Sequence, residues 1–306
     1  YNIPHTGEDM KMIYSLNARN KLNANRLEAY AQDTYKFMSP GQHTFFTLNY
    51  GIRFSHWNFN RETIISPRLS LSIVPPFNND VTFRFATGLY YQAPFFKELR
   101  HTTTVEGTTY ATLNKKIKSQ RSIHFIAAYD YKFKLNDRPY KFTAEAYFKA
   151  LGNIVPYSVN NVKIVYDASQ QCSGHALGLD MKLYGEFVPG ADSWVSLSVM
   201  STKINLKGKS IPMPTDQRYS LNLYFTDYFP GTDKWRMSLK LAFADGLPFG
   251  PPHRDLSQQQ FRAPAYKRAD IGMSYRLFDR EKSDKKKSVF KNVWLGIDCL
   301  NLFGIN

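Results

Sequence analysis

The chain has 306 residues, and 40 Lys plus Arg against 25 Asp plus Glu give it a formal charge of +15. Its 43% hydrophobic and 15% aromatic residues exclude a disordered chain, which lacks the large apolar side chains of a core. Only two cysteines, Cys172 and Cys299, exclude a disulfide scaffold, and no run of about eighteen apolar residues predicts a transmembrane helix.

Apolar residues recur with a period of two along almost the whole chain, which is the pattern of half-buried β-strands. Between residues 44 and 54, for example, an almost wholly apolar face alternates with a mostly polar one. Several of the predicted strands exceed the usual five or six residues. In chain order, the pattern predicts about twelve strands, near residues 25–37, 44–54, 65–73, 81–89, 123–132, 142–149, 177–183, 193–202, 217–227, 235–244, 267–277 and 289–300.

The connections between these strands alternate between short and long. The short ones contain Pro, Gly, Asn or Asp, which form tight reversals, and lie at 38–42, 74–80, 134–139, 188–192 and 230–234. The long ones lie at 94–117, 156–174, 204–216 and 246–264, with a short exception at 58–63. We therefore expect antiparallel up-and-down hairpins, with tight turns at one end and long loops at the other.

Alternation alone does not separate a soluble sandwich from a transmembrane barrel, but three features favour the barrel. The strand lengths suit a tilted crossing of the hydrocarbon core, which needs about nine to eleven residues. Aromatic residues that suit a membrane interface collect beside the short turns, at Tyr35, Phe37, Tyr131, Phe133, Tyr140, Phe187, Trp194, Tyr228, Phe229, Trp235, Phe278 and Phe290. The polar faces carry many charges, which suit a wet lumen, and we predict lumen-facing side chains at Arg53, Arg68, Arg84, Asp180, Arg218, Arg268 and Asp270.

The predicted fold class is therefore all-β, an antiparallel up-and-down transmembrane β-barrel. One residue departs from the pattern, because Asp33 falls on the apolar face of its strand, where we expect a bulge or an interface position. The positive charge is not gathered in one basic stripe, and its densest run, residues 280–287, is typical of a solvated turn. Nucleic acid is not an expected partner.

An ordered set of stretches resembles the C-terminal half of a TonB-dependent outer-membrane receptor of the type abundant in Bacteroidota. The resemblance covers essentially the whole chain. The matching stretches are RLEAYAQDT (26–34), ISPRLSLS (65–72), ATGLYYQAPFFKEL (86–99), IHFIAAYDYKF (123–133), TDQRYSLNLYFTDYFPG (215–231), GLPFGPP (246–252), YKRADIGMSYRL (266–277) and LNLFGIN (300–306).

The resemblance implies a 22-stranded barrel in the cell outer membrane, filled by an N-terminal plug that a TonB-type energy-coupling protein pulls from the periplasm. Residues 1–306 would then be a partial barrel domain, roughly strands ten to twenty-one, without the plug and the last strand. The short turns would face the periplasm and the long loops the outside. Outer-membrane lipid and lipopolysaccharide are expected partners, and a surface lipoprotein or other outer-membrane subunits are further candidates.

The candidate ligand-binding residues lie in two long loops. The loop at 246–264 combines rigid Pro-Gly turns with Phe249, His253, Arg254 and Phe261, and the loop at 94–117 opens with Phe95, Phe96 and Arg100. Either loop can instead pack over its neighbours or face lipopolysaccharide, and Arg100 and the nearby lysines can bind anionic lipid headgroups.

The lumenal arginines leave two hypotheses open. They can guide an anionic ligand, because a cluster of one sign focuses the local potential, or they can pair with carboxylates and hold the barrel contents. Asp216 with Arg218, and Arg268 with Asp270, are the candidate structural pairs, since residues two apart on a strand share a face.

The sequence gives no indication of an enzyme, a metal site or a cofactor. It contains no GxSxG, no HExxH and no Gly-rich phosphate loop, and the seven histidines have no metal-ligand spacing. The leading hypothesis is energised uptake of a scarce ligand through the outer membrane. The alternative is a non-transporting barrel that serves as a scaffold subunit of an outer-membrane assembly or secretion complex.

Overall fold

The computed structural model of the chain describes residues 15–17, 21–41, 43–105, 108–160, 163–188, 191–250, 261–279 and 289–304. Every regular element in these residues is a β-strand. No helix in the described residues is long and apolar enough to cross a membrane.

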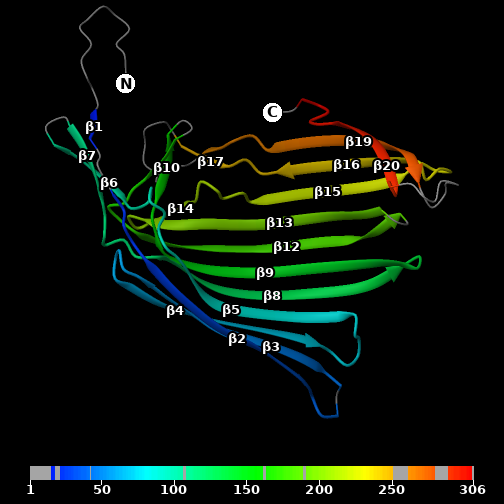
Figure 1. Ribbon diagram of the computed structural model, residues 1–306, viewed down its shortest axis with the longest axis horizontal. Coiled ribbons are helices and arrows are strands. Elements are labelled where there is room, and N and C mark those ends of the chain that lie inside the picture. Colours follow the sequence, from blue (N-terminus) through cyan, green and yellow to red (C-terminus); the bar gives the residue numbers. More distant parts are fainter. Residues whose placement is uncertain are drawn as a thin grey trace, which may run out of the picture.

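Twelve strands form one antiparallel sheet in which each strand pairs with its neighbours in the order of the chain (Figure 1). The prediction of about twelve up-and-down strands is therefore confirmed. The strands are β2 (Arg26–Met38), β3 (Phe45–Trp57), β4 (Glu62–Val74), β5 (Val81–Gln92), β8 (Gln120–Leu135), β9 (Arg138–Ile154), β12 (Cys172–Val188), β13 (Ala191–Leu206), β15 (Tyr219–Tyr228), β16 (Trp235–Ala244), β19 (Tyr266–Asp279) and β20 (Asn292–Cys299).

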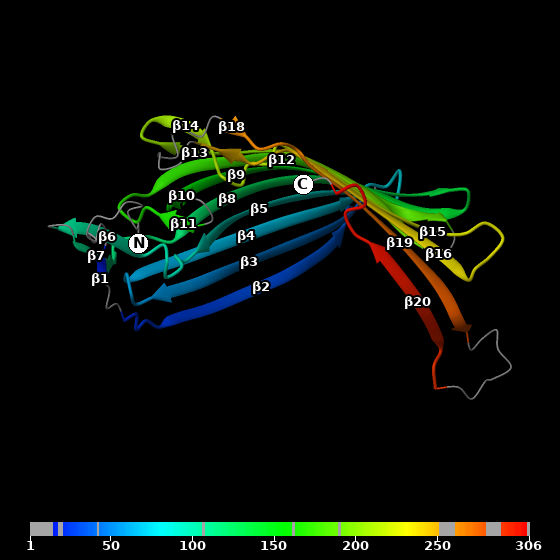
Figure 2. The ribbon, with the colours of Figure 1, turned by 90° about the horizontal axis from the view of Figure 1, so that it is seen from above.

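The sheet bends into an arc, with β2 and β20 at its two edges (Figure 2). Right-handed strand twist and long strands favour this curvature over a flat sheet. Among the described strands, β2 and β20 do not pair with each other, so each presents an open row of backbone hydrogen-bonding groups.

The two ends of the sheet differ, as the alternating connections predict. Short reversals join the strands at one end, on the right of Figure 1, which we call the turn end. The opposite end, which we call the loop end, carries the long connections and the tight turn between β3 and β4.

The long connections contain small strands that the alternating pattern did not predict. A sheet of β1, β7 and β6 and a hairpin of β10 and β11 project from the loop end, β14 pairs with β13, and β17 pairs with β18. Their bounds are β1 (Ser15–Asn17), β6 (Arg100–Val105), β7 (Thr108–Leu113), β10 (Tyr157–Asn160), β11 (Lys163–Tyr166), β14 (Lys209–Pro212), β17 (Pro248–Phe249) and β18 (Phe261–Arg262).

Aromatic rings beside the short turns contact one another within and across strands. The ring centroids of Phe37 on β2 and Phe46 on β3 lie 4.9 Å apart, and those of Phe133 on β8 and Tyr140 on β9 lie 5.4 Å apart. Tyr131 and Phe133, two residues apart on β8, have ring centroids 5.3 Å apart. Cross-strand aromatic pairs stabilise a sheet, and rings of this kind prefer the depth of the lipid headgroups. The turn end therefore carries an aromatic belt.

Of the two expectations for Asp33, a bulge or an interface position, the bulge is wrong. The register between β2 and β3 runs unbroken from Arg26 opposite Trp57 to Met38 opposite Phe45. Asp33 lies opposite Tyr50, whose hydroxyl donates a 3.0 Å hydrogen bond to the carboxylate. A polar partner on the same face, rather than an extra residue, accommodates this charge.

Buried apolar side chains gather at the loop end rather than in the middle of the sheet. One cluster joins Trp57, Leu99, Ile117, Val155 and Ala168, which come from the end of β3 and from the two long connections that follow β5 and β9. A second packs the loop ends of β9, β13 and β14 through Ile154, Ile204, Leu206 and Ile211. These two clusters thus fix the long connections against the loop end of the sheet.

Candidate functional site

The strand register places the predicted lumen-facing residues on one face of the sheet. Residues paired across neighbouring strands point to the same side, and the side alternates along each strand. Arg68 of β4 pairs with Gly51 of β3 and with Gly88 of β5, and these glycines point to the same side as Arg53 and Arg84 on their own strands. Further along the sheet, Asp180 of β12 pairs with Glu145 of β9. We call the face that carries Arg53, Arg68, Arg84, Asp180, Arg268 and Asp270 the polar face and its opposite the apolar face.

Arg218 lies just before β15 and is exposed. Its carbonyl oxygen accepts a 2.9 Å hydrogen bond from the amide of Met200, which extends the ladder between β13 and β15 by one pair. Because residues two apart on a strand share a face, Arg218 lies on the same face as Ser220, whereas Leu221 lies on the other, apolar face. Its position matches the polar face.

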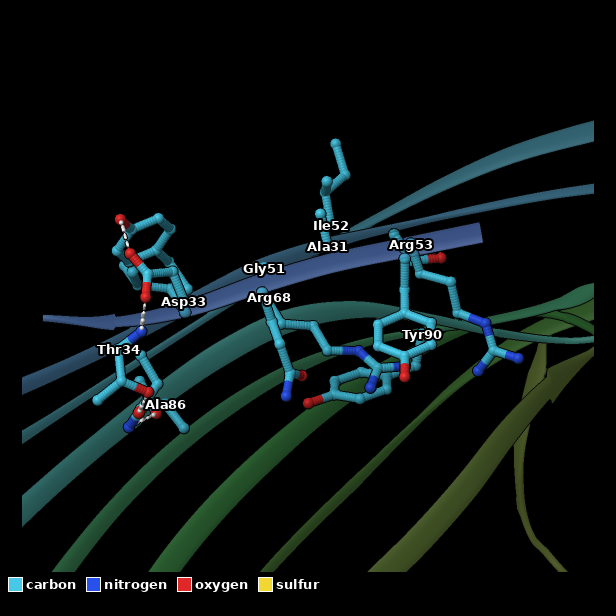
Figure 3. Close-up of a pocket in the computed structure, with 16 residues that line it drawn as sticks. Ala31, Asp33, Thr34, Gly51, Ile52, Arg53, Arg68, Ala86 and Tyr90 are labelled. Carbon is cyan, nitrogen blue, oxygen red and sulfur yellow. Dashed lines mark hydrogen bonds between the residues drawn. The ribbon is translucent and has the colours of Figure 1, made fainter. Parts of the chain in front are cut away.

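A shallow cavity of about 680 Å³ opens over β2 to β5 on the polar face. Figure 3 shows Arg53, Arg68 and Tyr90 on one side of these strands and Ile52 on the other. Gly88 leaves room for the Tyr90 ring at the edge of this cavity, because a Cβ atom there would lie 2.9 Å from that ring. Without that atom the ring lies across the strand.

Arg68 belongs to a stack of three side chains in this region. Its guanidinium carbon lies 4.6 Å from the ring centroid of Tyr90, and that ring stacks on His124 at 4.2 Å. A cation over an aromatic face is attracted to the ring but keeps its full positive charge. Arg68 forms no ion pair within the described part of the chain, so its charge stays available.

Arg84, in contrast, is neutralised by a carboxylate. Its Nε donates a 2.6 Å hydrogen bond to Asp130, whose other oxygen accepts one from the hydroxyl of Thr143 at 2.8 Å. The Lys141 ammonium lies 3.4 Å from the same carboxylate, and Glu145 lies 3.9 Å from Arg84. This cluster joins β5, β8 and β9 and holds its charges close to balance.

Two further arginines of the polar face are paired in the same way. Arg53 contacts Glu28 at 2.6 Å, and Arg268 contacts Asp270 at 2.8 Å, as the sequence spacing suggested for the second pair. Among the five predicted lumenal arginines, only Arg68 and Arg218 lack an ion pair in the described residues. The hypothesis of structural pairing therefore fits three of them, and that of an anion path fits two.

The predicted aromatic pair at 246–264 comes together at the loop end. Phe249 and Phe261 lie opposite each other in the hairpin of β17 and β18, with ring centroids 5.8 Å apart. Both rings stay about half exposed, at 50% and 56%. His253 and Arg254 lie outside the described residues.

Arg262, which sequence analysis missed, holds this hairpin in place. Its guanidinium donates to the carboxylates of Asp216 and Asp245, at 2.8 Å for the second, and to the carbonyl oxygen of Gly246 at 3.1 Å. Asp216 in turn accepts the amide of Thr202 at 2.5 Å. Buried charges need such partners, and here they tie the connection after β14 to the one after β16.

The expected pair of Asp216 with Arg218 is therefore wrong. Asp216 is 3% exposed and bonds to Arg262, which lies 46 positions further along the chain. Spacing along one strand predicted a local partner, but Asp216 lies in a connection, where strand alternation does not apply. No local signal in the sequence indicates a partner so distant.

Phe95, Phe96 and Arg100 lie on the connection between β5 and β8. In the sheet, the strands β8 to β16 separate this connection from the one that carries Phe249 and Phe261. Phe95 and Phe96 are 59% and 46% exposed, and Arg100 begins β6. The Glu98 carboxylate fixes this turn, because it accepts the amide of Phe95 at 2.8 Å and the side chain of Gln120 at 3.0 Å. The two aromatic sites do not contact each other within the described residues.

The base beneath Phe95 and Phe96 is tightly bonded. Glu62, at the start of β4, accepts the amide and the hydroxyl of Ser119 at 2.9 and 2.6 Å. Asn60, in the preceding turn, donates to the carbonyl oxygen of Ile117 at 2.9 Å. Exposed aromatic rings thus stand on a rigid scaffold, as binding loops often do.

Asp167, in the connection between β11 and β12, accepts hydrogen bonds from Ser169 and Gln170, with the Ser169 amide at 3.0 Å. Burial alone would raise the pKa of this carboxyl, but the hydrogen bonds to its charged form outweigh burial and lower the pKa. The carboxylate therefore caps the turn in its ionised form. Within the described residues, no three His, Cys, Asp or Glu side chains gather as they would around a metal ion.

The curved antiparallel sheet, its two unlike faces and its aromatic belt define a transmembrane β-barrel of the outer membrane. The chain belongs to the family described as "TonB dependent receptor-like, beta-barrel", whose model matches residues 4–298. This family consists of outer-membrane receptors. Comparison of the sequence with curated proteins gives no significant match.

Solved structures of such receptors share the fold. The ferric enterobactin receptor PfeA of Pseudomonas aeruginosa is 19% identical, with a TM-score of 0.62 over 95% of this chain and 42% of that one. The ferric-catecholate import receptor Fiu of E. coli K12 is 12% identical, with a TM-score of 0.60 over 92% and 40%. The copper transporter OprC is 12% identical, with a TM-score of 0.63 over 92% and 43%. The chain thus spans about two fifths of the length of these receptors.

Proposed function

We propose that this chain is the C-terminal part of the barrel of an energised outer-membrane receptor of the Bacteroidota type. The family match over residues 4–298 carries the proposal. The open edges of β2 and β20 support it, because both present backbone groups to which further strands of a 22-stranded barrel can bond. In this proposal residues 1–306 belong to one barrel domain, and the plug lies elsewhere in the protein.

In the proposed receptor, the polar face lines a wet lumen and the apolar face contacts lipid. The many charges of the polar face support this orientation, since no water reaches the hydrocarbon to solvate them. Arg68 and Arg218 would attract an anionic group of a ligand or of the plug. Arg53, Arg84 and Arg268 would hold the wall together through their carboxylate partners.

Capture would begin at the loop end. Phe95, Phe96 and Arg100 form one contact site, and the Phe249–Phe261 pair, with His253 and Arg254 between its rings in sequence, forms a second. Half-exposed rings on a rigid base bury apolar ligand surface without the entropic cost of ordering the loop on binding. A TonB-type coupling protein would then pull on the plug and open the lumen to the ligand.

An uptake assay of the complete protein tests this function. Cells that carry it in the outer membrane would be offered ferric siderophores, a cobalamin, oligosaccharides and peptides. We expect accumulation of one of these classes, abolished by a protonophore while surface binding persists. Accumulation that survives the protonophore would contradict energised import.

The non-transporting scaffold is the competing outcome of the same assay. It predicts no accumulation of any ligand class and stable co-purification with other outer-membrane subunits. A reversal of charge, Arg68→Glu, sharpens the distinction. Import of an anionic ligand should weaken in this variant, whereas a scaffold should assemble unchanged.

A further inference from the structure

The small sheet at the loop end has an open edge. Its strands lie in the order β1, β7, β6, so β6 pairs with β7 on one side and, within the described residues, with no strand on the other. Figure 1 and Figure 2 show this sheet projecting beyond the loop end of the barrel wall. The open edges of β2 and β20 belong to the wall, where further barrel strands can bond, but β6 lies outside that wall.

The hydrogen bonds of the hairpin show which backbone groups face this edge. The amide of Asn114 donates a 2.7 Å hydrogen bond to the carbonyl oxygen of Leu99, which makes them a hydrogen-bonded pair at the base of the hairpin. Hydrogen-bonded and non-hydrogen-bonded pairs alternate in an antiparallel ladder, and the register along β6 has no break. The N–H and C=O groups of Arg100 and Thr102 therefore point away from β7, toward the open edge.

β6 lacks the devices that usually protect such an edge. Natural sheets block their edges with Pro, with Lys or with a bulge. The sequence of β6 is RHTTTV, in which the last four residues are all β-branched, and neither Pro nor a bulge interrupts the strand. Thr102, Thr103 and Val105 are exposed. The edge is therefore suited to receive another strand.

The opposite edge of the same sheet already holds an added strand. β1 comes from a distant part of the sequence and pairs in parallel with β7, with Ser15 opposite Thr108 and Asn17 opposite Tyr110. This small sheet thus binds extended backbone at one edge through main-chain pairing. β6 offers a second edge of the same kind.

The base of β6 carries groups that suit the end of a peptide. Arg100 begins the strand, is partly exposed and forms no ion pair within the part of the chain that the structure describes. The exposed rings of Phe95 and Phe96 precede it. A strand added antiparallel to β6 runs from the tip of the hairpin to its base. Its C-terminal carboxylate would therefore arrive beside the Arg100 guanidinium, which binds carboxylates in charge-assisted hydrogen bonds.

We propose that β6 binds an extended peptide by strand addition, antiparallel to β6 and with the peptide's C-terminal carboxylate at Arg100. Main-chain hydrogen bonds to Thr102 would supply affinity, and packing of peptide side chains on Phe95 and Phe96 would supply specificity. The proposal rests on the outward orientation of the loop end in the proposed receptor. It names a polypeptide as the class of ligand that this contact site captures.

The complete protein, purified in nanodiscs of phosphatidylcholine, provides the test. The probe is a fluorescent hexapeptide of alternating valine and serine, as long as β6, with a free C-terminal carboxylate. Its C-terminal amide and its form N-methylated at every backbone amide are the comparison peptides. Thr102→Pro removes the outward N–H but keeps the ladder with β7, since Pro is tolerated where the N–H faces away from the sheet. Thr102→Val, which keeps the amide and the branched side chain, is the matched control.

Thr102→Pro should bind the probe about five-fold more weakly, the loss expected for one main-chain hydrogen bond, and Thr102→Val should bind like the unaltered protein. Arg100→Gln should weaken binding of the carboxylate probe about ten-fold and leave binding of the amide unchanged. Hydrogen exchange at the Thr102 amide should slow when the probe binds.

Three results would overturn strand addition: no binding of the probe, equal binding of the N-methylated peptide, or unchanged affinity in Thr102→Pro. A dimer of the purified protein that Thr102→Pro dissociates would also overturn it, because the edge would then pair with a second copy of this chain. Uptake is not measured in this experiment. Energised import can therefore fail in the uptake assay while peptide binding holds, and the reverse.

Discussion

Charges in the barrel wall and charges in the outer loops have different surroundings. The Arg53–Glu28 pair of the wall lies on an open face, with side chains 45% and 39% exposed. Arg262 and its partner Asp216 in the loops are 18% and 4% exposed. The same ion pair chemistry is therefore screened in one region and desolvated in the other.

This difference assigns different tasks to the two regions. Exposed pairs in the wall contribute little stability but leave a charged, wet face. The buried cluster around Arg262 fixes two connections in one geometry, because moving either would leave Asp216 or Asp245 buried without a partner. Substitutions that remove a charge from the loops should therefore destabilise the protein more than substitutions that remove a charge from the wall.

The largest effect is expected for Arg262→Met. Losing one partner of a buried ion cluster costs about 3–5 kcal/mol, because the remaining carboxylates stay desolvated. Hydrogen exchange should show the loss at the amide of Ala263, which bonds to the carbonyl oxygen of Leu247 at 3.0 Å. Unchanged protection of Ala263 would show that the cluster does not hold the hairpin.

The next effect separates the two faces of the wall. Leu241→Arg places a charge on the apolar face and should lower the free energy of unfolding by about 2–4 kcal/mol. Ser238→Arg, on the polar face of the same strand, should cost little, and Asp298 lies close by as a partner. Urea unfolding of the complete protein in lipid vesicles measures both, and equal losses would remove the distinction between the faces.

A smaller effect is expected for Arg53→Gln, the wall counterpart of Arg262→Met. Exposed ion pairs contribute at most about 1 kcal/mol, so the free energy of unfolding should fall by no more than that. The same urea titration measures it. A loss as large as that in Arg262→Met would mean that the wall and loop charges are not different in kind.

The smallest effect is local and depends on pH. The pKa of Asp167 lies below its ordinary value of 3.8, so its cap on the turn is complete above that value and fades as the pH falls through the lowered pKa. The Ser169 amide should therefore keep its protection from exchange until the pH falls below about 4. In Asp167→Asn the protection should no longer vary with pH, and an unchanged pH profile there would assign the effect to another group.

The sequence predicted the wall well because a strand has one strict rule, a side-chain period of two. That rule placed Arg53, Arg84 and Asp270 on one face and put tight turns and long loops at opposite ends. It also flagged Asp33 as an exception. The partner of that carboxylate, Tyr50, lies on the same face of the neighbouring strand, which the pattern of β2 alone could not reveal.

The loops were less predictable, because their contacts join residues distant in the sequence. Strand alternation does not govern Asp216 or Arg262, so their bond could not be derived from spacing. The hairpins of β6 with β7 and β10 with β11 lie in segments without an extended alternating pattern. The aromatic pair of Phe249 and Phe261 was found because large exposed rings beside Pro-Gly turns are a composition signal.

Cysteine labelling of β16 tests most directly the central claim, that alternate residues of one strand face lipid and water. Leu241→Cys should resist a water-soluble maleimide in intact membranes, and Ser238→Cys should react once the lumen is opened. Leu241 and Ser238 lie three residues apart on β16, opposite Ala269 and Gly272 of β19, and so point to opposite faces of the sheet. Free labelling of Leu241→Cys with no labelling of Ser238→Cys would contradict the account, because the polar face would then be turned away from water.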